Sequence, residues 1–249
     1  MSAHSGRNAG SKAGGEASGR DTVLLLHGLW MNGFVMSWLA HALDRAGFRT
    51  EAVDYRGTRD GMDAHVDRLA QAVAQTQGAR IHIVGHSMGG VIAMRYLAQS
   101  GDTRSSRSAD TRSSRSADAR SSRLADARVC RLVLLGAPVR GSQAARDFEG
   151  HALGRMLLGA SVALWRAPFE PRVPAGFEVG AIAGTNAFGL GALFVTLPGE
   201  NDGVVTVEET RIDGLRDHIV LPVSHTGMLM SDPVAAQTAA FLAHGRFER

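Results

Sequence analysis

The chain has 249 residues, of which 44% are hydrophobic and 20% are charged. This length fits one α/β domain with a substantial core, and the composition excludes a wholly disordered or a fibrous protein. The formal net charge is +3, and residues 102–128 alone hold seven arginines and four aspartates, so this one segment accounts for the whole excess (7 − 4 = 3). The rest of the chain is formally neutral, and we expect no nucleic-acid partner.

Residues 1–20 are rich in glycine, serine and alanine and carry scattered charges, which predicts a disordered N-terminal tail. They lack the apolar stretch of a signal peptide. No apolar run in the chain approaches the roughly 18 to 20 residues that cross a bilayer, so we expect no integral membrane segment. The single cysteine, Cys130, has no partner for an intramolecular disulfide. These features predict a cytoplasmic protein and leave its oligomeric state open.

Residues 21–249 are expected to form one domain, because short apolar runs alternate with segments of helical periodicity, as in a parallel sheet covered by helices. Between residues 62 and 76, for example, apolar residues at i, i+3, i+4 and i+7 from Val66 define one buried helix face. The expected strands are Val23–Leu26, Thr50–Tyr55, Ile81–Val84, Leu132–Leu135, Val179–Ala183 and His218–Pro222. The expected helices are Trp38–Ala46, Met62–Thr76, Met88–Ala98 and Ala235–Phe241.

Residues 102–125 consist of three tandem octads, DTRSSRSA, DTRSSRSA and DARSSRLA. A period of eight matches neither a helical stripe nor a solenoid repeat, and Leu124 is the one large apolar side chain. We therefore expect a disordered surface insertion over residues 102–126, since a longer surface loop costs little free energy. A docking tether for an acidic partner, or a phosphorylation target, is the alternative interpretation.

Residues 142–170 carry many apolar side chains and are followed by closely spaced prolines. This pattern fits a small helical lid over an acyl pocket, and it equally fits an ordinary helix packed on the sheet.

The segment Gly85-His86-Ser87-Met88-Gly89 matches the pattern G-x-S-x-G and lies between an expected strand and an expected helix. A sharp strand-to-helix turn needs small flanking residues and presents its central side chain at the tip. The context therefore predicts that Ser87 is a catalytic nucleophile, rather than part of a turn without chemistry.

Acyl transfer at a serine also needs two N–H donors for the developing oxyanion. We expect these to be the backbone N–H groups of Met88, directly after the serine, and of Leu29, where Gly28 lets the chain bend inward after the first strand. His27, like His86, is expected to brace its loop by hydrogen bonding rather than to react.

A serine hydroxyl is a weak nucleophile, so a general base must accompany it, and the chain order Ser, acid, His places that base late in the sequence. His225 follows the last expected strand, at the edge of the sheet where such sites collect. The acid that orients it is expected to be Asp202 in the segment Asn201-Asp202-Gly203, although a turn aspartate is the simpler reading of that residue. Asp213 and Asp217 are the alternatives closer to the last strand.

The segments HGL, GHSMGG, NDGVV and SHTGM, in this order, resemble lipase-like and esterase-like members of the α/β-hydrolase superfamily over nearly the whole of residues 22–242. The resemblance implies an α/β-hydrolase fold, with a mostly parallel central sheet, helices on both faces and a small helical lid. It extends to the small lipases related to triacylglycerol lipases, which usually carry Gln where Met88 stands. That difference should be tolerated because the expected donor is a backbone N–H. No metal site and no cofactor are expected.

The residues and the resemblance together predict hydrolysis of carboxylic esters through a Ser-His-Asp triad and an acyl-enzyme, with a small ester or a lipid-like molecule as substrate. A thioesterase or amidase would use the same triad, and a non-catalytic binding or regulatory protein could keep the same fold. The apolar residues considered for the substrate pocket are Trp30, Phe34, Trp165, Phe169 and Leu229.

Overall fold

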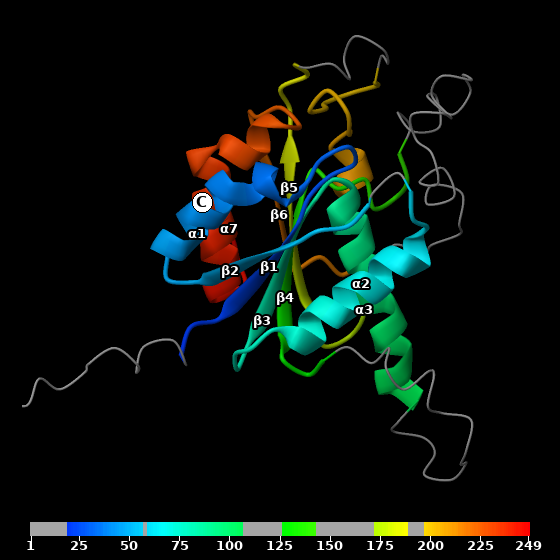
Figure 1. The fold of residues 1–249 in the computed structure, drawn as a ribbon. Helices are drawn as coiled ribbons and strands as arrows, with labels where there is room; N and C mark the ends of the chain where they lie inside the picture. Colours follow the sequence, from blue (N-terminus) through cyan, green and yellow to red (C-terminus); the bar gives the residue numbers. More distant parts are fainter. Residues whose placement is uncertain (1–18, 57–58, 107–125, 143–171, 189–196) are drawn as a thin grey trace, which may run out of the picture.

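The computed structural model describes residues 19–56, 59–106, 126–142, 172–188 and 197–249 (Figure 1). In this part of the chain a single sheet contains the strands β1 (Thr22–Leu26), β2 (Arg49–Val53), β3 (Ile81–His86), β4 (Val129–Leu135), β5 (Glu178–Gly184) and β6 (Asp217–Leu221). Its order is β2-β1-β3-β4-β5-β6, and every neighbouring pair is parallel. The predicted parallel sheet is confirmed.

Helices cover both faces of this sheet, as predicted (Figure 1). On one face lie α1 (Ser37–Arg45) and α7 (Asp232–His244), and on the other lie α2 (Met62–Gln75) and α3 (Met88–Ser106). None of the described helices is long and apolar enough to cross a bilayer.

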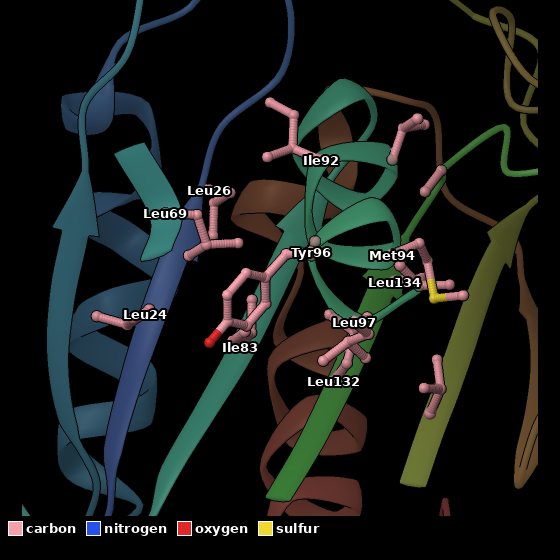
Figure 2. Close-up of a cluster of buried hydrophobic side chains, with 14 of the residues drawn as sticks. Leu24, Leu26, Leu69, Ile83, Ile92, Met94, Tyr96, Leu97, Leu132 and Leu134 are labelled. Atoms are coloured by element: carbon pink, nitrogen blue, oxygen red, sulfur yellow. The ribbon is translucent and has the colours of Figure 1, made fainter. Parts of the chain in front are cut away.

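The strand side chains alternate between two apolar clusters, one on each face of the sheet. In β1, Val23 and Leu25 pack with α1 and α7, whereas Leu24 and Leu26 pack with α2 and α3. Figure 2 shows the second cluster, in which Tyr96 of α3 lies among leucine and isoleucine side chains of the strands. Burial on both faces explains why inner strands such as β1 read as continuous apolar runs, whereas the edge strands β2 and β6 carry polar residues and are partly exposed.

The strand order places a topological switch point between β1 and β3, because the chain moves from β1 outward to β2 and then returns to the other side of β1. Loops that follow two such strands turn away from each other and leave a crevice at the carboxyl edge of the sheet. The segments that follow β1 and β3 hold the predicted oxyanion loop and Ser87, so the fold brings these two motifs to one place.

Some element boundaries differ from those expected. The strand predicted as Thr50–Tyr55 ends at Val53, so Asp54 and Tyr55 leave the sheet and their side chains become available to neighbouring loops. The helix α7 begins three residues before the expected start because the Ser231 side chain accepts a hydrogen bond from the N–H of Val234 and caps the helix.

The expected boundaries of the octad insertion are wrong at both ends. The helix α3 continues through Ser106, since adding a turn to an existing helix needs no new nucleation and no proline interrupts the segment. At the other end, Asp126 is ordered by hydrogen bonds to Arg128. The remaining residues 107–125, the tail over 1–18 and the possible lid over 143–171 lie outside the described residues.

Arg128 joins the end of the insertion to the end of α2. Its guanidinium donates hydrogen bonds to the carbonyl oxygens of Val73 (3.1 Å) and Thr76 (2.7 Å), and it is also bonded to both carboxylate oxygens of Asp126. Carbonyl groups in the last turn of a helix have no donor within the helix, so a cation there supplies both hydrogen bonds and a favourable charge.

We predict that Arg128→Ala lowers the free energy of unfolding by about 1 to 2 kcal/mol, because several hydrogen bonds from a charged group are lost at a half-buried site. Urea unfolding followed by circular dichroism measures the change. The control is Arg140→Ala, whose exposed ion pair with Glu208 should contribute less than about 0.5 kcal/mol. Equal midpoints for the two variants would contradict the capping role of Arg128.

Candidate active site

Ser87 stands alone between the last residue of β3 and the first residue of α3, and its backbone has a φ of 54°. A positive φ is uncommon for any residue other than glycine and is maintained only when surrounding contacts enforce it. Among the described residues, Trp30 (φ 59°) is the other non-glycine residue in this conformation, and it follows Leu29 directly. Each of these two left-handed residues is therefore next in sequence to a predicted oxyanion donor, Ser87 to Met88 and Trp30 to Leu29.

Glycines around Ser87 allow the helix to pack against the sheet closely enough to enforce this turn. A Cβ atom at Gly85 would lie 2.5 Å from the backbone of Gly90, and one at Gly89 would lie 2.5 Å from the carbonyl oxygen of Leu26 in β1. No side chain fits at those distances. The G-x-S-x-G-G pattern is thus explained by the approach of α3 to β1 and β3, and the N–H of Ser87 completes the turn by donating to the carbonyl of Leu135 in β4 (2.9 Å).

The loop after β1 lies directly beside this turn. A Cβ atom at Gly28 would be 3.0 Å from Nδ1 of His86 and 3.3 Å from Cβ of Ser87, so any larger residue would force these neighbours to shift. The buried His27 ring donates from Nδ1 to the carbonyl oxygen of Gly28 (2.8 Å). Leu29 packs against the edge of the core on the α2 and α3 side, in the same cluster as Met88, which is 1% exposed.

Asp202 and His225, distant in sequence, are hydrogen-bonded in the structure. Nδ1 of His225 donates to Oδ2 of Asp202 (2.8 Å), and the backbone N–H of His225 donates to the carbonyl oxygen of Asp202 (2.9 Å). The second carboxylate oxygen accepts the N–H groups of Val204 (2.9 Å) and Val205 (2.7 Å). Asp202 is 1% exposed, so a buried carboxylate is satisfied on both oxygens, and the bond at Nδ1 leaves Nε2 of His225 as the basic nitrogen.

His86 links this pair to the serine turn. Its Nε2 donates to the carbonyl oxygen of His225 (2.9 Å), and the two rings are 4.7 Å apart. Complete burial is the main reason that the pKa of His86 falls to about 3, and the nearby His225 lowers it further. A neutral His86 therefore holds the His225 segment beside the residue that precedes Ser87.

The alternative acids and a competing histidine have other partners. The carboxylate of Asp217 accepts the N–H of Phe247 (2.9 Å) and pairs with Arg249, whereas Asp213 is exposed. His218, inside β6, is bonded to the hydroxyl of Thr210 (2.9 Å), and burial lowers its pKa to about 4. Of the three aspartates considered for the acid, Asp202 is the one bonded to His225.

The pattern of one protein family matches residues 23–244, nearly the same span as the fold just described. The chain belongs to the alpha/beta hydrolase family. Membership supports a hydrolase activity in general terms.

Solved structures with the same fold include the mature lipase BlEst2 of Bacillus licheniformis, with a TM-score of 0.62 and 16% identity over 94% of each chain. A carboxylesterase from Nitrososphaera gargenis has a TM-score of 0.58 and 17% identity over 91% of each chain. The metagenomic carboxyl esterase MGS0156 has a TM-score of 0.57 and 17% identity, over 88% of this chain and 70% of its own. At this level of identity the likeness concerns the fold.

Two further glycines of this alpha/beta hydrolase make room for the Asp202 and His225 side chains, and the sequence analysis did not identify them. A Cβ atom at Gly136, which has a φ of 52°, would lie 2.9 Å from Oδ2 of Asp202 and 3.2 Å from Nδ1 of His225. One at Gly184 would lie 2.8 Å from Cβ of Asp202. Gly136 lies at the carboxyl end of β4 and Gly184 at that of β5. A glycine at the carboxyl end of a parallel strand is the feature of the sequence that could have identified them as site residues.

A cavity of about 450 Å³ lies at the carboxyl end of β2 and is separate from the candidate triad. Most of the residues that line it have polar or charged side chains. It is lined by Asp54, Tyr55, Arg56, Asp60, Ala64, His65, Asp67, Arg68 and Gln71. In the part of the chain that the structure describes, no group of three or more His, Cys, Asp or Glu side chains could hold a metal ion.

We predict that Gly136→Ala disrupts the bond between His225 and Asp202 and lowers the free energy of unfolding by about 2 to 3 kcal/mol, since crowding adds to the cost of a left-handed backbone. The measurement is the NMR resonance of the His225 Nδ1 proton, which should shift or disappear.

The matched control is Gly199→Ala, because Gly199 has a similar φ of 68° but nothing within 4 Å of an added Cβ. It should cost about 1 kcal/mol of strain and leave the His225 resonance in place. An unchanged resonance in Gly136→Ala would show that the site has more room than the distances indicate.

Proposed function

We propose that this alpha/beta hydrolase is a serine hydrolase that cleaves carboxylic esters, with Ser87 as nucleophile, His225 as general base and Asp202 as the residue that orients His225. The observation that carries the proposal is the buried His225–Asp202 hydrogen bond, joined through His86 to a serine in a strained strand-to-helix turn. If Ser87 were only part of a turn, a glycine could take the left-handed conformation at lower cost. If Asp202 were only a turn residue, it would not need a buried imidazole as its partner.

In the first step, Nε2 of His225 takes the proton of the Ser87 hydroxyl while Oγ attacks the ester carbonyl carbon. The Asp202 carboxylate, bonded to Nδ1, keeps the tautomer in which Nε2 is free and stabilises the imidazolium that forms. Among the described residues the Ser87 hydroxyl makes no hydrogen bond to His225, and we expect this bond to form in the complex with substrate, because catalytic hydrogen bonds often close only when substrate binds.

The negative charge on the former carbonyl oxygen would be held by the backbone N–H groups of Leu29 and Met88. Met88 is the first residue of α3, where N–H groups have no acceptor within the helix and the helix dipole favours an anion. The imidazolium then gives its proton to the leaving alcohol as the C–O bond breaks, which leaves an acyl group on Ser87. A water molecule that gives a proton to His225 attacks this acyl-enzyme, and the imidazolium returns the proton to Oγ of Ser87 as the bond to the acyl carbon breaks and the acid is released.

Large exposed apolar side chains in the segments that follow β1, β5 and His225 support a substrate with an apolar group. Trp30 and Phe34, both considered in the sequence, are 60% and 82% exposed in the segment after β1. Phe188 (79% exposed) follows β5, and Met230 (64% exposed) follows His225. Leu229 instead lies in the core on the α1 and α7 side. A small or lipid-like ester fits these surroundings, and a cytoplasmic location stays a prediction from the sequence.

A thioester or an amide would need the same nucleophile, base and donors, so rates on matched ester, thioester and amide substrates are the measurement that separates these classes. A series of p-nitrophenyl esters of increasing chain length then defines the acyl preference. A non-catalytic role is favoured if the folded protein turns over none of these substrates.

We predict that Ser87→Ala lowers kcat for a p-nitrophenyl ester by about 10⁶-fold and abolishes labelling by a fluorophosphonate, because the nucleophile is removed while the fold is retained. Ser231→Ala is the control: it removes the cap of α7 at a cost of about 1 kcal/mol but should be labelled at the wild-type rate. Labelling of a different residue in the wild-type protein would refute the assignment.

We predict that Asp202→Asn lowers kcat by about 10⁴-fold, because the amide favours the wrong tautomer of His225 and cannot stabilise the imidazolium. Asp213→Asn, at an exposed position, should keep the wild-type kcat. The assignment of the acid is wrong if the two variants show the reverse order of activity.

A further inference from the structure

We propose that Tyr55 is a positioning residue for catalysis: acting through His27, it fixes the direction in which the Leu29 N–H points at the oxyanion. This inference rests on the proposed function and adds to it a residue outside the triad and outside the recognised motifs. Tyr55 lies just past the end of β2, where the sequence suggested a strand residue.

The Leu29 N–H direction is set by the peptide group that joins Gly28 to Leu29. A trans peptide is planar, and its C=O and N–H point in opposite directions. In this peptide the carbonyl oxygen of Gly28 accepts a hydrogen bond from Nδ1 of His27 (2.8 Å). Whatever holds the His27 ring therefore also holds the Leu29 N–H.

Tyr55 holds His27 in two ways. The two rings are stacked, with centroids 4.2 Å apart and an angle of 7° between their planes. In addition, the Tyr55 hydroxyl donates a hydrogen bond to the backbone carbonyl oxygen of His27. The ring contact holds the imidazole that bonds the Gly28 carbonyl, and the hydroxyl holds the peptide between His27 and Gly28, directly before the peptide that carries the Leu29 N–H.

The surroundings of Tyr55 keep it in place. Its other ring neighbour is His65 of α2, at 5.0 Å, and His65 is 2% exposed. The preceding residue, Asp54, accepts the N–H of Gly33 (2.8 Å), so two adjacent side chains after β2 hold both ends of the segment from His27 to Gly33. Burial raises the pKa of Tyr55 above its usual range, which keeps the hydroxyl protonated and able to donate.

The test uses Tyr55→Phe, which keeps the stacked ring and removes only the hydroxyl. We expect kcat for a p-nitrophenyl ester, and the rate of Ser87 labelling by a phosphonate whose oxygen occupies the oxyanion site, to fall by about 10- to 100-fold. The KM should change less than about twofold, because a uniform loss of substrate binding is not involved. Amide hydrogen exchange at Leu29, followed by NMR, should become faster.

Tyr96→Phe is the matched control, since Tyr96 is the other tyrosine of the chain and also loses a hydroxyl bonded to a backbone group, the N–H of Asp126 (3.4 Å). It lies in the core cluster of α3, as Figure 2 shows. Its kcat, labelling rate and Leu29 exchange should equal those of the wild type. Gln71→Ala tests whether the effect instead comes from the neighbouring polar cavity, and it too should be neutral.

A double-variant cycle tests the route through His27. In a His27→Asn background the Tyr55→Phe change should lose most of its effect, because once Nδ1 of residue 27 no longer holds the Gly28 carbonyl, holding the neighbouring His27 carbonyl no longer fixes the Leu29 N–H. Full additivity of the two changes, or a Tyr55→Phe protein with wild-type kcat and wild-type Leu29 exchange, overturns the inference. If wild-type protein neither turns over esters nor labels at Ser87, the proposed function fails, and Leu29 exchange in Tyr55→Phe alone decides the role of Tyr55.

Discussion

The close approach of α3 to β1 and β3 is the constraint on which the rest of this site depends. Gly85 and Gly89 have no Cβ atom at the two points where the backbones of β3, β1 and α3 lie closest together. The helix can therefore begin with a single residue, Ser87, between it and the strand. The backbone has space for that turn only if Ser87 adopts a left-handed conformation. The packing of the two apolar clusters on the sheet supplies the free energy that maintains this strain.

The same requirement for space recurs along the carboxyl edge of the sheet. Gly28, after β1, leaves space for the Ser87 turn. Gly136, after β4, leaves space for the His225–Asp202 pair, and Gly184, at the end of β5, leaves space for Asp202. Parallel strands bring their carboxyl ends to one edge, and polar side chains from loops can meet there only if the strand ends themselves are small. The glycines thus form one structural feature that three separate loops share.

Several buried polar groups in this region are connected to one another, although Nε2 of His27 and Nδ1 of His86 have no hydrogen-bond partner among the described residues. Asp202 is satisfied by two backbone N–H groups and by His225, whose carbonyl in turn accepts Nε2 of His86. Next to them, Tyr55 and His27 fix the loop that carries Leu29. A network of this kind makes the geometry rigid because moving one group would leave another buried and unpaired. Preorganised donors of this sort are what oxyanion stabilisation requires.

The sequence by itself determined the parallel α/β architecture, since runs such as Val23–Leu26 and Leu132–Leu135 are apolar on both faces and alternate with amphipathic helices. It also singled out Ser87, because a local pattern of glycines between a strand and a helix encodes the turn. The sequence favoured Asp202 as the acid, but only the tertiary structure shows that Asp202, and neither Asp213 nor Asp217, bonds His225, and that Gly136 lies against this pair and Tyr55 against His27. These contacts join residues that lie on different loops and are far apart in the sequence. Such contacts produce no periodic pattern in the chain, so the sequence alone could not reveal them.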